Sequence, residues 1–359
     1  MSPPFPARYW HRRSDGRVVC DLCPQGCALA PGHTGRCGVR RATEQGLQLL
    51  VYGQASGLSV DPIEKKPLLH FLPGSAVLSF GTAGCNLSCC FCQNAALSRG
   101  RPEAVAHQRA TPAQIARAAR DLGCRSVAFT YNEPLVFLEY AIDVAAACHE
   151  QGLLTVAVTA GQVNAAPRAE FFRHMDAANV DLKALDERFY RDLCGGSLAA
   201  VLETLAYLHD ETKVWLEVTH LVIPGENDAP ADLARLSQWV LDHLGPTVPL
   251  HFSAFHPDAD LWHRPPTPPV TLRQARATAR TLGVRHAYTG NVADDEGSST
   301  WCHACGTLLI GRRGFLATSW ALGPGGQCPT CGTPCAGCFD ARPGTWGGSR
   351  RSIQLADHA

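Results

Sequence analysis

The decisive stretch of this sequence reads Gly84-Cys85-Asn86-Leu87-Ser88-Cys89-Cys90-Phe91-Cys92 and comes shortly after the apolar run 76–80. Three residues separate Cys85 from Cys89, and two separate Cys89 from Cys92. Cysteine thiolates are the usual ligands of iron–sulfur clusters. Three thiolates on one loop can hold three irons of a 4Fe-4S cubane and leave the fourth iron without a protein ligand. The stretch therefore predicts a 4Fe-4S cluster with one iron open to another donor.

Cys90 is an additional thiol inside this stretch. A zinc site that includes Cys90 is the alternative to the cluster. Because the three flanking cysteines already have the spacing that a cluster needs, we predict that Cys90 is a packing residue.

The sequence on both sides of this stretch alternates short apolar runs with amphipathic segments from about residue 76 to residue 290. This alternation predicts repeated βα units around a parallel sheet. Expected strands are 76–80, 126–130, 154–159, 180–182, 214–223 and 250–255, with 285–288 as a further candidate. Expected helices are one that begins at Thr111-Pro112 and four at 134–151, 197–208, 229–244 and 271–282. About six units fall short of the usual eight, so we predict an α/β fold with a partial (β/α)6 TIM-like barrel.

Polar residues stand where several of these strands end, and barrel active sites are built at the carboxyl ends of strands. Asn132 and Glu133 follow the second strand, and Asp181 and Lys183 end the fourth. Alternation along a strand places Asp181 and Lys183 on the same side. Two plainer explanations remain open: Glu133 begins a helix, where an acidic residue is favourable, and Asp181 forms a surface ion pair with Lys183.

The cysteine spacing, with the aromatic Phe91 just before the third cysteine, resembles the radical S-adenosylmethionine (SAM) superfamily. In that family the amino and carboxylate groups of SAM supply the donors to the open iron. The resemblance implies that the reduced cluster cleaves SAM to methionine and a 5'-deoxyadenosyl radical, which abstracts hydrogen from a substrate. The protein then supplies binding, orientation and exclusion of water.

Site roles follow from the same resemblance. Glu133 stands where the family binds the SAM amino group, and Asp181-Leu182-Lys183 resembles the Asp-x-Lys of glycyl-radical activating enzymes. Ala160 departs from the family, which has Asn at this place, so that side-chain contact is lost. The predicted cofactor-binding residues are Phe91, Asn132, Glu133, Asp181, Lys183, His220 and His256; we prefer His256 to His251 because it follows the carboxyl end of its strand.

The order of elements from Cys20 to about Gly332 resembles one subfamily, the radical SAM enzyme of the AmmeMemoRadiSam system, which is related to pyruvate formate-lyase activating enzymes. This resemblance implies AMMECR-like and Memo-like partner proteins and an electron donor such as a flavodoxin or ferredoxin. Two other hypotheses stay open. One is a glycyl-radical activase whose substrate is another protein's backbone, and the other is a non-enzymatic metal-binding or nucleic-acid module that uses the basic pair Arg312-Arg313.

Two more groups of cysteines flank the predicted barrel. In the carboxyl-terminal group two Cys-x-x-Cys knuckles have the pattern of a zinc ribbon, in which four thiolates close a tetrahedral structural site; the knuckles are Cys302-x-x-Cys305 and Cys328-x-x-Cys331. For the amino-terminal group zinc and a second iron–sulfur cluster are both chemically plausible; its members are Cys20, Cys23, Cys27 and Cys37. Cys335 and Cys338 form a further pair that either competes as ligands or is free. Three isolated cysteines are predicted to be packing residues: Cys124, Cys148 and Cys194.

Composition sets the remaining expectations. The chain has 359 residues, 17 cysteines, and equal numbers of basic and acidic residues, 32 each. Clustered cysteines favour metal ligation over disulfides, and the neutral net charge argues against nucleic acid as a partner. Without a signal peptide or a long apolar run, we expect a cytoplasmic protein with no membrane contact. The predicted parts are a Cys-rich metal-binding lobe (1–45), the radical SAM core (46–295), the zinc-ribbon-like module (296–345) and a flexible tail (346–359).

Overall fold

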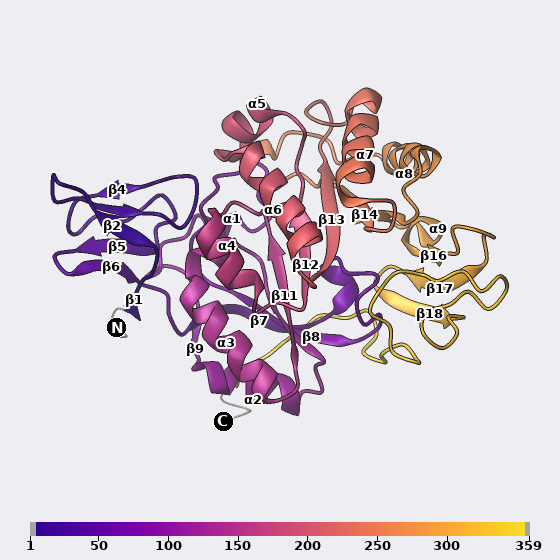
Figure 1. The fold of residues 1–359 in the computed structure, drawn as a ribbon, viewed down its shortest axis with the longest axis horizontal. Helices are drawn as coiled ribbons and strands as arrows, with labels where there is room; N and C mark the ends of the chain where they lie inside the picture. Colours follow the sequence, from indigo (N-terminus) through magenta and orange to yellow (C-terminus); the bar gives the residue numbers. More distant parts are fainter. Residues whose placement is uncertain (1–4, 356–359) are drawn as a thin grey trace.

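The computed structural model describes residues 5–355 and shows a central curved sheet with a small cysteine-rich part at each end (Figure 1). The first parallel strand of the central sheet, β8 (Ala76–Gly81), has all six residues buried, so its uninterrupted apolar run reflects a strand covered on both faces. Phe80 and Phe129 from neighbouring strands stack edge to face in the core beneath the helices. No helix within 5–355 is both long enough and apolar enough to cross a membrane.

Seven parallel strands form the body of the sheet. Their order in space follows the chain: β8 (Ala76–Gly81), β10 (Ser126–Phe129), β11 (Leu154–Thr159), β12 (Ala177–Asp181), β13 (Trp215–Val222), β14 (Leu250–Ala254) and β15 (Ala287–Gly290). Beyond β8 the sheet continues with the antiparallel β7 (Gln54–Pro62), which also pairs with β9 (Gln108–Arg109) and β19 (Arg351–Ser352). In the described part of the chain β15 and β19 are the two ends of the path, so the predicted partial barrel is confirmed.

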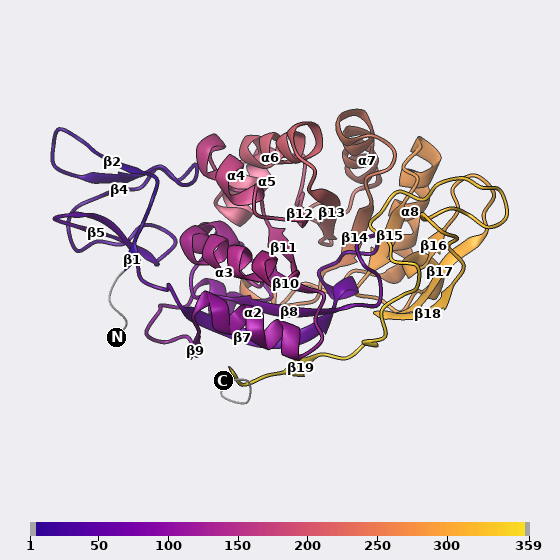
Figure 2. The ribbon, with the colours of Figure 1, turned by 60° about the horizontal axis from the view of Figure 1, so that its bottom comes forward.

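Helices connect the parallel strands and lie in a row beside them (Figure 2). The helix that begins at Pro112 has the predicted start, because Thr111 and Gln114 form a reciprocal capping box. The longer helices are α2 (Pro112–Asp121), α3 (Leu138–Glu150), α4 (Ala165–Phe172), α6 (Leu198–Glu211), α7 (Pro230–Leu244) and α8 (Pro269–Leu282). Shorter turns are α1 (Ala95–Ser98), α5 (Glu187–Phe189), α9 (Asp295–Ser298), three 3-10 turns, η1 (Ile63–Lys65), η2 (Pro134–Phe137) and η4 (Ala259–Leu261), and a π-helical turn, η3 (Tyr190–Cys194).

The amino-terminal lobe contains two small antiparallel sheets. One consists of β1 (Phe5–Pro6), β6 (Gly46–Leu49) and β5 (Arg40–Thr43), and the other of β2 (Trp10–Arg12), β3 (Val18–Cys20) and β4 (Ala28–Leu29). Pairing of β6 with β5 carries the lobe to Leu49. Arg40 anchors the lobe to the barrel, since its Nη2 lies 2.6 Å from Glu139 Oε2 and both side chains are buried.

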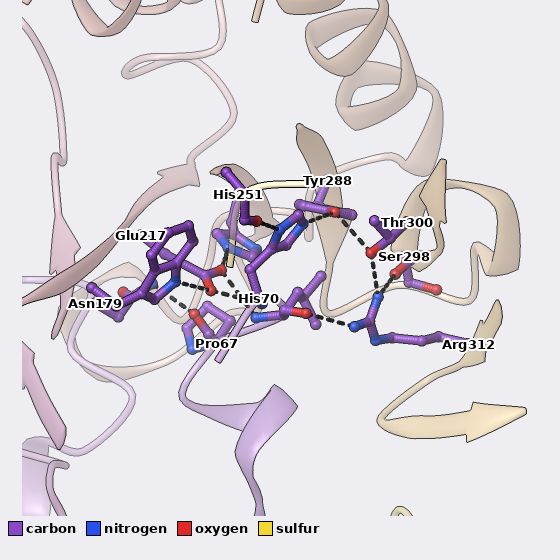
Figure 3. Close-up of polar contacts among 12 residues, drawn as sticks. Pro67, His70, Asn179, Glu217, His251, Tyr288, Ser298, Thr300 and Arg312 are labelled. Carbon is purple, nitrogen blue, oxygen red and sulfur yellow. Dashed lines mark hydrogen bonds and ion pairs between the residues drawn. The ribbon is translucent and has the colours of Figure 1, made fainter. Parts of the chain in front are cut away.

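The carboxyl-terminal module contains β16 (Thr300–Trp301), β17 (Leu308–Arg313) and β18 (Leu316–Trp320). A buried polar network joins it to the amino ends of the barrel strands (Figure 3). On the barrel side Glu217 accepts the backbone N–H groups of Leu69 and His70 and lies 2.6 Å from His251 Nε2. On the module side Arg312 donates to Thr300 Oγ1 at 2.8 Å and to the carbonyl oxygen of Leu69 at 2.6 Å.

Arg312 has a different role from the one that the nucleic-acid hypothesis required. Its side chain is completely buried and lies 3.7 Å from Glu64, which is also completely buried. Only Arg313 of the basic pair is exposed. The structure therefore contradicts the use of the Arg312-Arg313 pair as a nucleic-acid contact.

The end of the chain differs from the predicted flexible tail. Residues Arg351–Ser352 pair with β7, and Ile353 and Leu355 are buried. The physical reason is that β7 offers unpaired backbone groups at the sheet edge, which a passing extended segment can satisfy. Residues 356–359 of the predicted tail lie outside the described residues.

Candidate active site

The loop that carries Cys85, Cys89 and Cys92 begins at the carboxyl end of β8. Gly84 has φ +87°, and a Cβ there would overlap the carbonyl oxygen of Cys37, so glycine is required at this position. Asn132 holds the start of the loop: its Nδ2 donates to the carbonyl oxygen of Gly84 at 2.6 Å, and its Oδ1 accepts from the Thr82 N–H at 3.1 Å. These hydrogen bonds support the cysteine loop. Asn132, which is predicted to contact the cofactor, therefore also holds the loop in place.

The far side of the loop is held by the π-helical turn η3. The backbone N–H groups of Ser88 and Cys90 donate to the carbonyl oxygens of Cys194 and Leu193 at 2.8 and 2.9 Å. The Cys194 thiol also donates to Cys89 and lowers the pKa of Cys89 to about 7. Cys194 is buried as predicted for a packing residue, but it packs directly against a predicted cluster ligand. Nothing in its sequence context indicated this contact.

Glu133 lies at the carboxyl end of β10, buried, and reaches toward the next strand. Its two carboxylate oxygens accept from Thr159 Oγ1 at 2.6 Å and from the Ala160 N–H at 2.8 Å. Burial raises the pKa of Glu133 to about 7, although these hydrogen bonds and the Lys183 ammonium act in the opposite direction. The family has Asn where this chain has Ala160. The contact with Glu133 does not depend on that side chain, because the backbone N–H of Ala160 makes it.

Asp181 and Lys183 lie side by side at the end of β12, as the alternation predicted. Lys183 Nζ donates to Asp181 Oδ2 at 2.8 Å and lies 5.9 Å from the centre of the Phe91 ring. Burial alone would lower the pKa of Lys183, but Asp181 and the sulfur of Cys89 outweigh it and raise that pKa well above its ordinary value. The ammonium is therefore charged and close to the cysteine loop. The alternative of a plain surface ion pair does not fit, since Lys183 is only 9% exposed.

The two histidines predicted for the site lie apart from each other. His220 is buried on β13, and its Nδ1 lies 2.9 Å from the carbonyl oxygen of Leu182. Burial lowers the pKa of His220, so the neutral ring donates from Nδ1 and does not offer a positive charge to a carboxylate. His256 follows β14 at the carboxyl end and is exposed, with Nε2 3.2 Å from the carbonyl oxygen of Asn291. His251 instead belongs to the buried network with Glu217 at the opposite end of the strands.

The donor set of the loop fits a cubane with three protein ligands. Within the described residues, the sulfurs of Cys85, Cys89 and Cys92 do not form a group in which all ligand atoms lie within 4.8 Å of one another. A tetrahedral zinc ion with Zn–S bonds of about 2.3 Å requires sulfurs about 3.8 Å apart, whereas the thiolates of a four-iron cluster bind different irons and lie farther apart. The loop sulfurs therefore do not form a ready-made zinc site, and a cluster with three protein ligands fits them better.

The four cysteines of the carboxyl-terminal module come together at the narrower spacing. The sulfurs of Cys302 and Cys331 are 3.6 Å apart, as are those of Cys305 and Cys328. All four lie within 4.8 Å of one another, so they could hold one metal ion with no ligand position left for a substrate.

Cys335 and Cys338 lie outside this group of four. Cys335 Sγ is within 4.8 Å of ring nitrogens of His70 and His286, a buried cluster that the sequence did not indicate because its members are far apart in the chain. Both nitrogens of His70 already have partners, the carbonyl oxygen of Ala336 at 2.6 Å and the hydroxyl of Tyr288. These contacts make His70 part of the buried network, whereas the buried His286 Nε2 has no hydrogen-bond partner among the described residues.

A family model, two protein sequences and a solved structure are similar to this chain. Residues 80–237 match the model of the radical SAM superfamily. An uncharacterized protein of Methanocaldococcus jannaschii is 38% identical over 311 residues, which cover 87% of this chain and 92% of that protein. The pyruvate formate-lyase-activating enzyme of Clostridium pasteurianum is 26% identical over 157 residues, 43% of this chain and 65% of that enzyme. Among solved structures, a radical SAM methyltransferase from Sphaerobacter thermophilus superimposes with a TM-score of 0.49 at 16% identity, over 80% of this chain and 77% of that one.

Proposed function

The chain belongs to the radical SAM superfamily, and from that premise we propose that it is the radical-forming enzyme of an AmmeMemoRadiSam system. A 4Fe-4S cluster held by Cys85, Cys89 and Cys92 would supply the chemistry, reductive cleavage of SAM to a 5'-deoxyadenosyl radical that takes hydrogen from a substrate. The single observation that carries this proposal is the convergence of the cysteine loop, Glu133 and Lys183 at the carboxyl ends of β8, β10 and β12.

The chain's own residues would bind and orient SAM. Glu133, whose oxygens reach the carboxyl end of β11, would accept a hydrogen bond from the SAM amino group. Lys183, held in place by Asp181, would offer its charge to an anionic or polar group of SAM. Phe91 beneath the Lys183 ammonium would contribute apolar contact and exclude water from the loop.

Several further assignments complete the proposal. His256 stands at the open carboxyl end and would contact the adenosine part of SAM or the substrate, whereas the neutral His220 suits a role in positioning Lys183 through Leu182. The four cysteines of the carboxyl-terminal module would hold a structural zinc ion. Partners would be a flavodoxin or ferredoxin as reductant and the AMMECR-like and Memo-like proteins, in the cytoplasm.

A glycyl-radical activase is the second candidate, favoured by the 26% identity to the activating enzyme of Clostridium pasteurianum. That match covers 43% of this chain and 65% of that enzyme. The two candidates share SAM cleavage and differ in the substrate. Formation of a glycyl radical, detected as a doublet in the electron paramagnetic resonance (EPR) spectrum of a co-incubated glycyl-radical enzyme, would favour the second candidate over the first.

SAM binding at the open iron is tested by EPR. Protein reconstituted anaerobically with iron and sulfide and reduced with dithionite should give a 4Fe-4S signal whose g-values change when SAM is added. Cys89→Ala should lose this SAM-sensitive signal, and Cys124→Ser, at a buried cysteine remote from the loop, should keep it. A wild-type spectrum that SAM leaves unchanged would contradict the proposal.

A further inference from the structure

The amino-terminal cysteines surround a hollow between the lobe and the barrel. Its volume is about 330 Å³ with the open side included. Four cysteines line it, together with Arg40 from the lobe and Asn86 from the cysteine loop: Cys20, Cys23, Cys27 and Cys37. Cys20 and Cys23 are buried, and Cys27 and Cys37 are half-buried.

The spacing of these sulfurs separates the two candidate metals. The carboxyl-terminal module of the same protein has its four sulfurs within 4.8 Å of one another, with two pairs at 3.6 Å. No three sulfurs of the amino-terminal group meet that limit, although all four face one hollow. Sulfurs about 3.8 Å apart would suit zinc, whereas the thiolates of a four-iron cluster bind different irons and lie farther apart. The sulfurs of Cys85, Cys89 and Cys92 likewise do not meet the 4.8 Å limit.

The surroundings of the hollow suit a group with net negative charge. The Arg40 guanidinium is buried on the wall of the hollow, where it also pairs with Glu139. The Arg36 backbone N–H donates to Cys27 Sγ at 3.4 Å. Four thiolates on a cluster leave a net negative charge, which a buried cation and N–H donors stabilise.

The hollow shares a wall with the SAM-cluster loop. Asn86, which lines the hollow, is the residue after Cys85 and is 1% exposed. Gln25 Nε2 donates to the carbonyl oxygen of Asn86 at 3.1 Å, so the two cysteine loops are bonded to each other. At Gly84 the backbone approaches Cys37 so closely that no side chain would fit.

We propose that Cys20, Cys23, Cys27 and Cys37 hold a second 4Fe-4S cluster, next to the SAM cluster and closed to SAM. With four protein thiolates this cluster has no open iron, so its signal is insensitive to SAM. The lobe is then an iron–sulfur domain, in contrast to the zinc-type module at the other end. Binding of this cluster does not depend on SAM cleavage.

The test uses the full chain with Cys85, Cys89 and Cys92 all changed to Ala, reconstituted anaerobically. We expect about four irons and four sulfides per chain to remain, together with about one zinc, and a dithionite-reduced EPR signal that SAM does not alter. Loss of all iron with about two zinc ions per chain would overturn the proposal in favour of a zinc lobe. Two irons and two sulfides per chain would also overturn it, because the group would be a smaller cluster.

A reciprocal variant guards against misfolding. Cys27→Ala should lower the iron content from about eight to about four per chain while the SAM-sensitive EPR signal, a report on the intact barrel, persists. Cys338→Ala, at a half-buried cysteine beside the other module, should keep all of the iron. Unchanged iron in Cys27→Ala would contradict the assignment. If wild type fails to cleave SAM while the triple variant retains four irons, the proposed function fails and this inference stands.

Discussion

Glu133 gives the most specific prediction. Burial of its carboxylate destabilises the folded protein, and the proposed hydrogen bond to the SAM amino group forms only when SAM binds. Burial raises the pKa of Glu133 from the ordinary 4.5 to about 7. A raised carboxyl pKa means that the folded protein holds the proton more tightly than the unfolded chain, so stability falls as the pH rises from 4.5 to 7. Above pH 7 the loss reaches about 3 kcal/mol, at 1.36 kcal/mol for each pH unit of the difference.

Glu133→Gln keeps the shape of the side chain and removes the charge. The amide oxygen can still accept from the Ala160 N–H and the amide NH2 can donate to Thr159 Oγ1, but the NH2 then faces the Leu135 N–H, so the variant should be more stable than wild type at pH 8 by up to about 3 kcal/mol. This advantage should shrink toward zero as the pH falls below 4.5, where the carboxyl becomes protonated in both states. Urea unfolding of reconstituted protein, followed by tryptophan fluorescence at several pH values, measures the difference.

The same variant should bind SAM more weakly. A hydrogen bond to a charged acceptor contributes about 1.5–3 kcal/mol, so affinity should fall about 10- to 100-fold. The ratio of the variant's SAM dissociation constant to that of wild type isolates the effect of Glu133, because protonation of SAM itself affects both measurements equally. That ratio should shrink below pH 7, where the wild-type carboxyl is neutral. A variant that binds SAM as tightly as wild type at pH 8 would refute the role of Glu133, whatever its stability.

Three other predictions test the supporting structure. Gly84→Ala should cost about 2 kcal/mol or more and disturb both cysteine loops, because φ is +87° and the added Cβ meets Cys37; reduced iron content on reconstitution would show this, and wild-type iron content would contradict it. Arg312→Met should cost about 3–5 kcal/mol in urea unfolding, since Glu64 loses its buried partner, while the exposed Arg313→Ala should change stability by less than about 0.5 kcal/mol; equal effects would contradict the buried network. Cys305→Ser should lower zinc by about one ion per chain and leave iron unchanged; unaltered zinc would show that the module's sulfurs do not share an ion.

The parallel core and the position of the cluster loop could be predicted because both depend on local signals. Apolar runs at βα spacing indicated the strands, and the spacing of Cys85, Cys89 and Cys92 indicated the loop. Asp181 and Lys183 could be placed together from strand alternation alone, and the structure brings them within 2.8 Å.

The remaining features depend on contacts between distant segments. Asn132 is predicted to contact the cofactor, and its amide also bonds to the backbone around Gly84, a contact that only the packing of β10 against β8 creates. Cys194 had no local feature that would place it beside Cys89. The burial of Arg312 depends on its ion pair with Glu64, which is far away in the sequence. Pairing of Arg351–Ser352 with β7 likewise depends on a free sheet edge that no local pattern indicates.

The central claim is that Cys85, Cys89 and Cys92 hold the cluster that cleaves SAM, and quantification of 5'-deoxyadenosine tests it most directly. Anaerobically reconstituted wild-type protein, given SAM and dithionite, should release 5'-deoxyadenosine and methionine, and Cys89→Ala should release none above the protein-free background. No 5'-deoxyadenosine from wild-type protein with a full iron content, or an undiminished yield from Cys89→Ala, would contradict the claim.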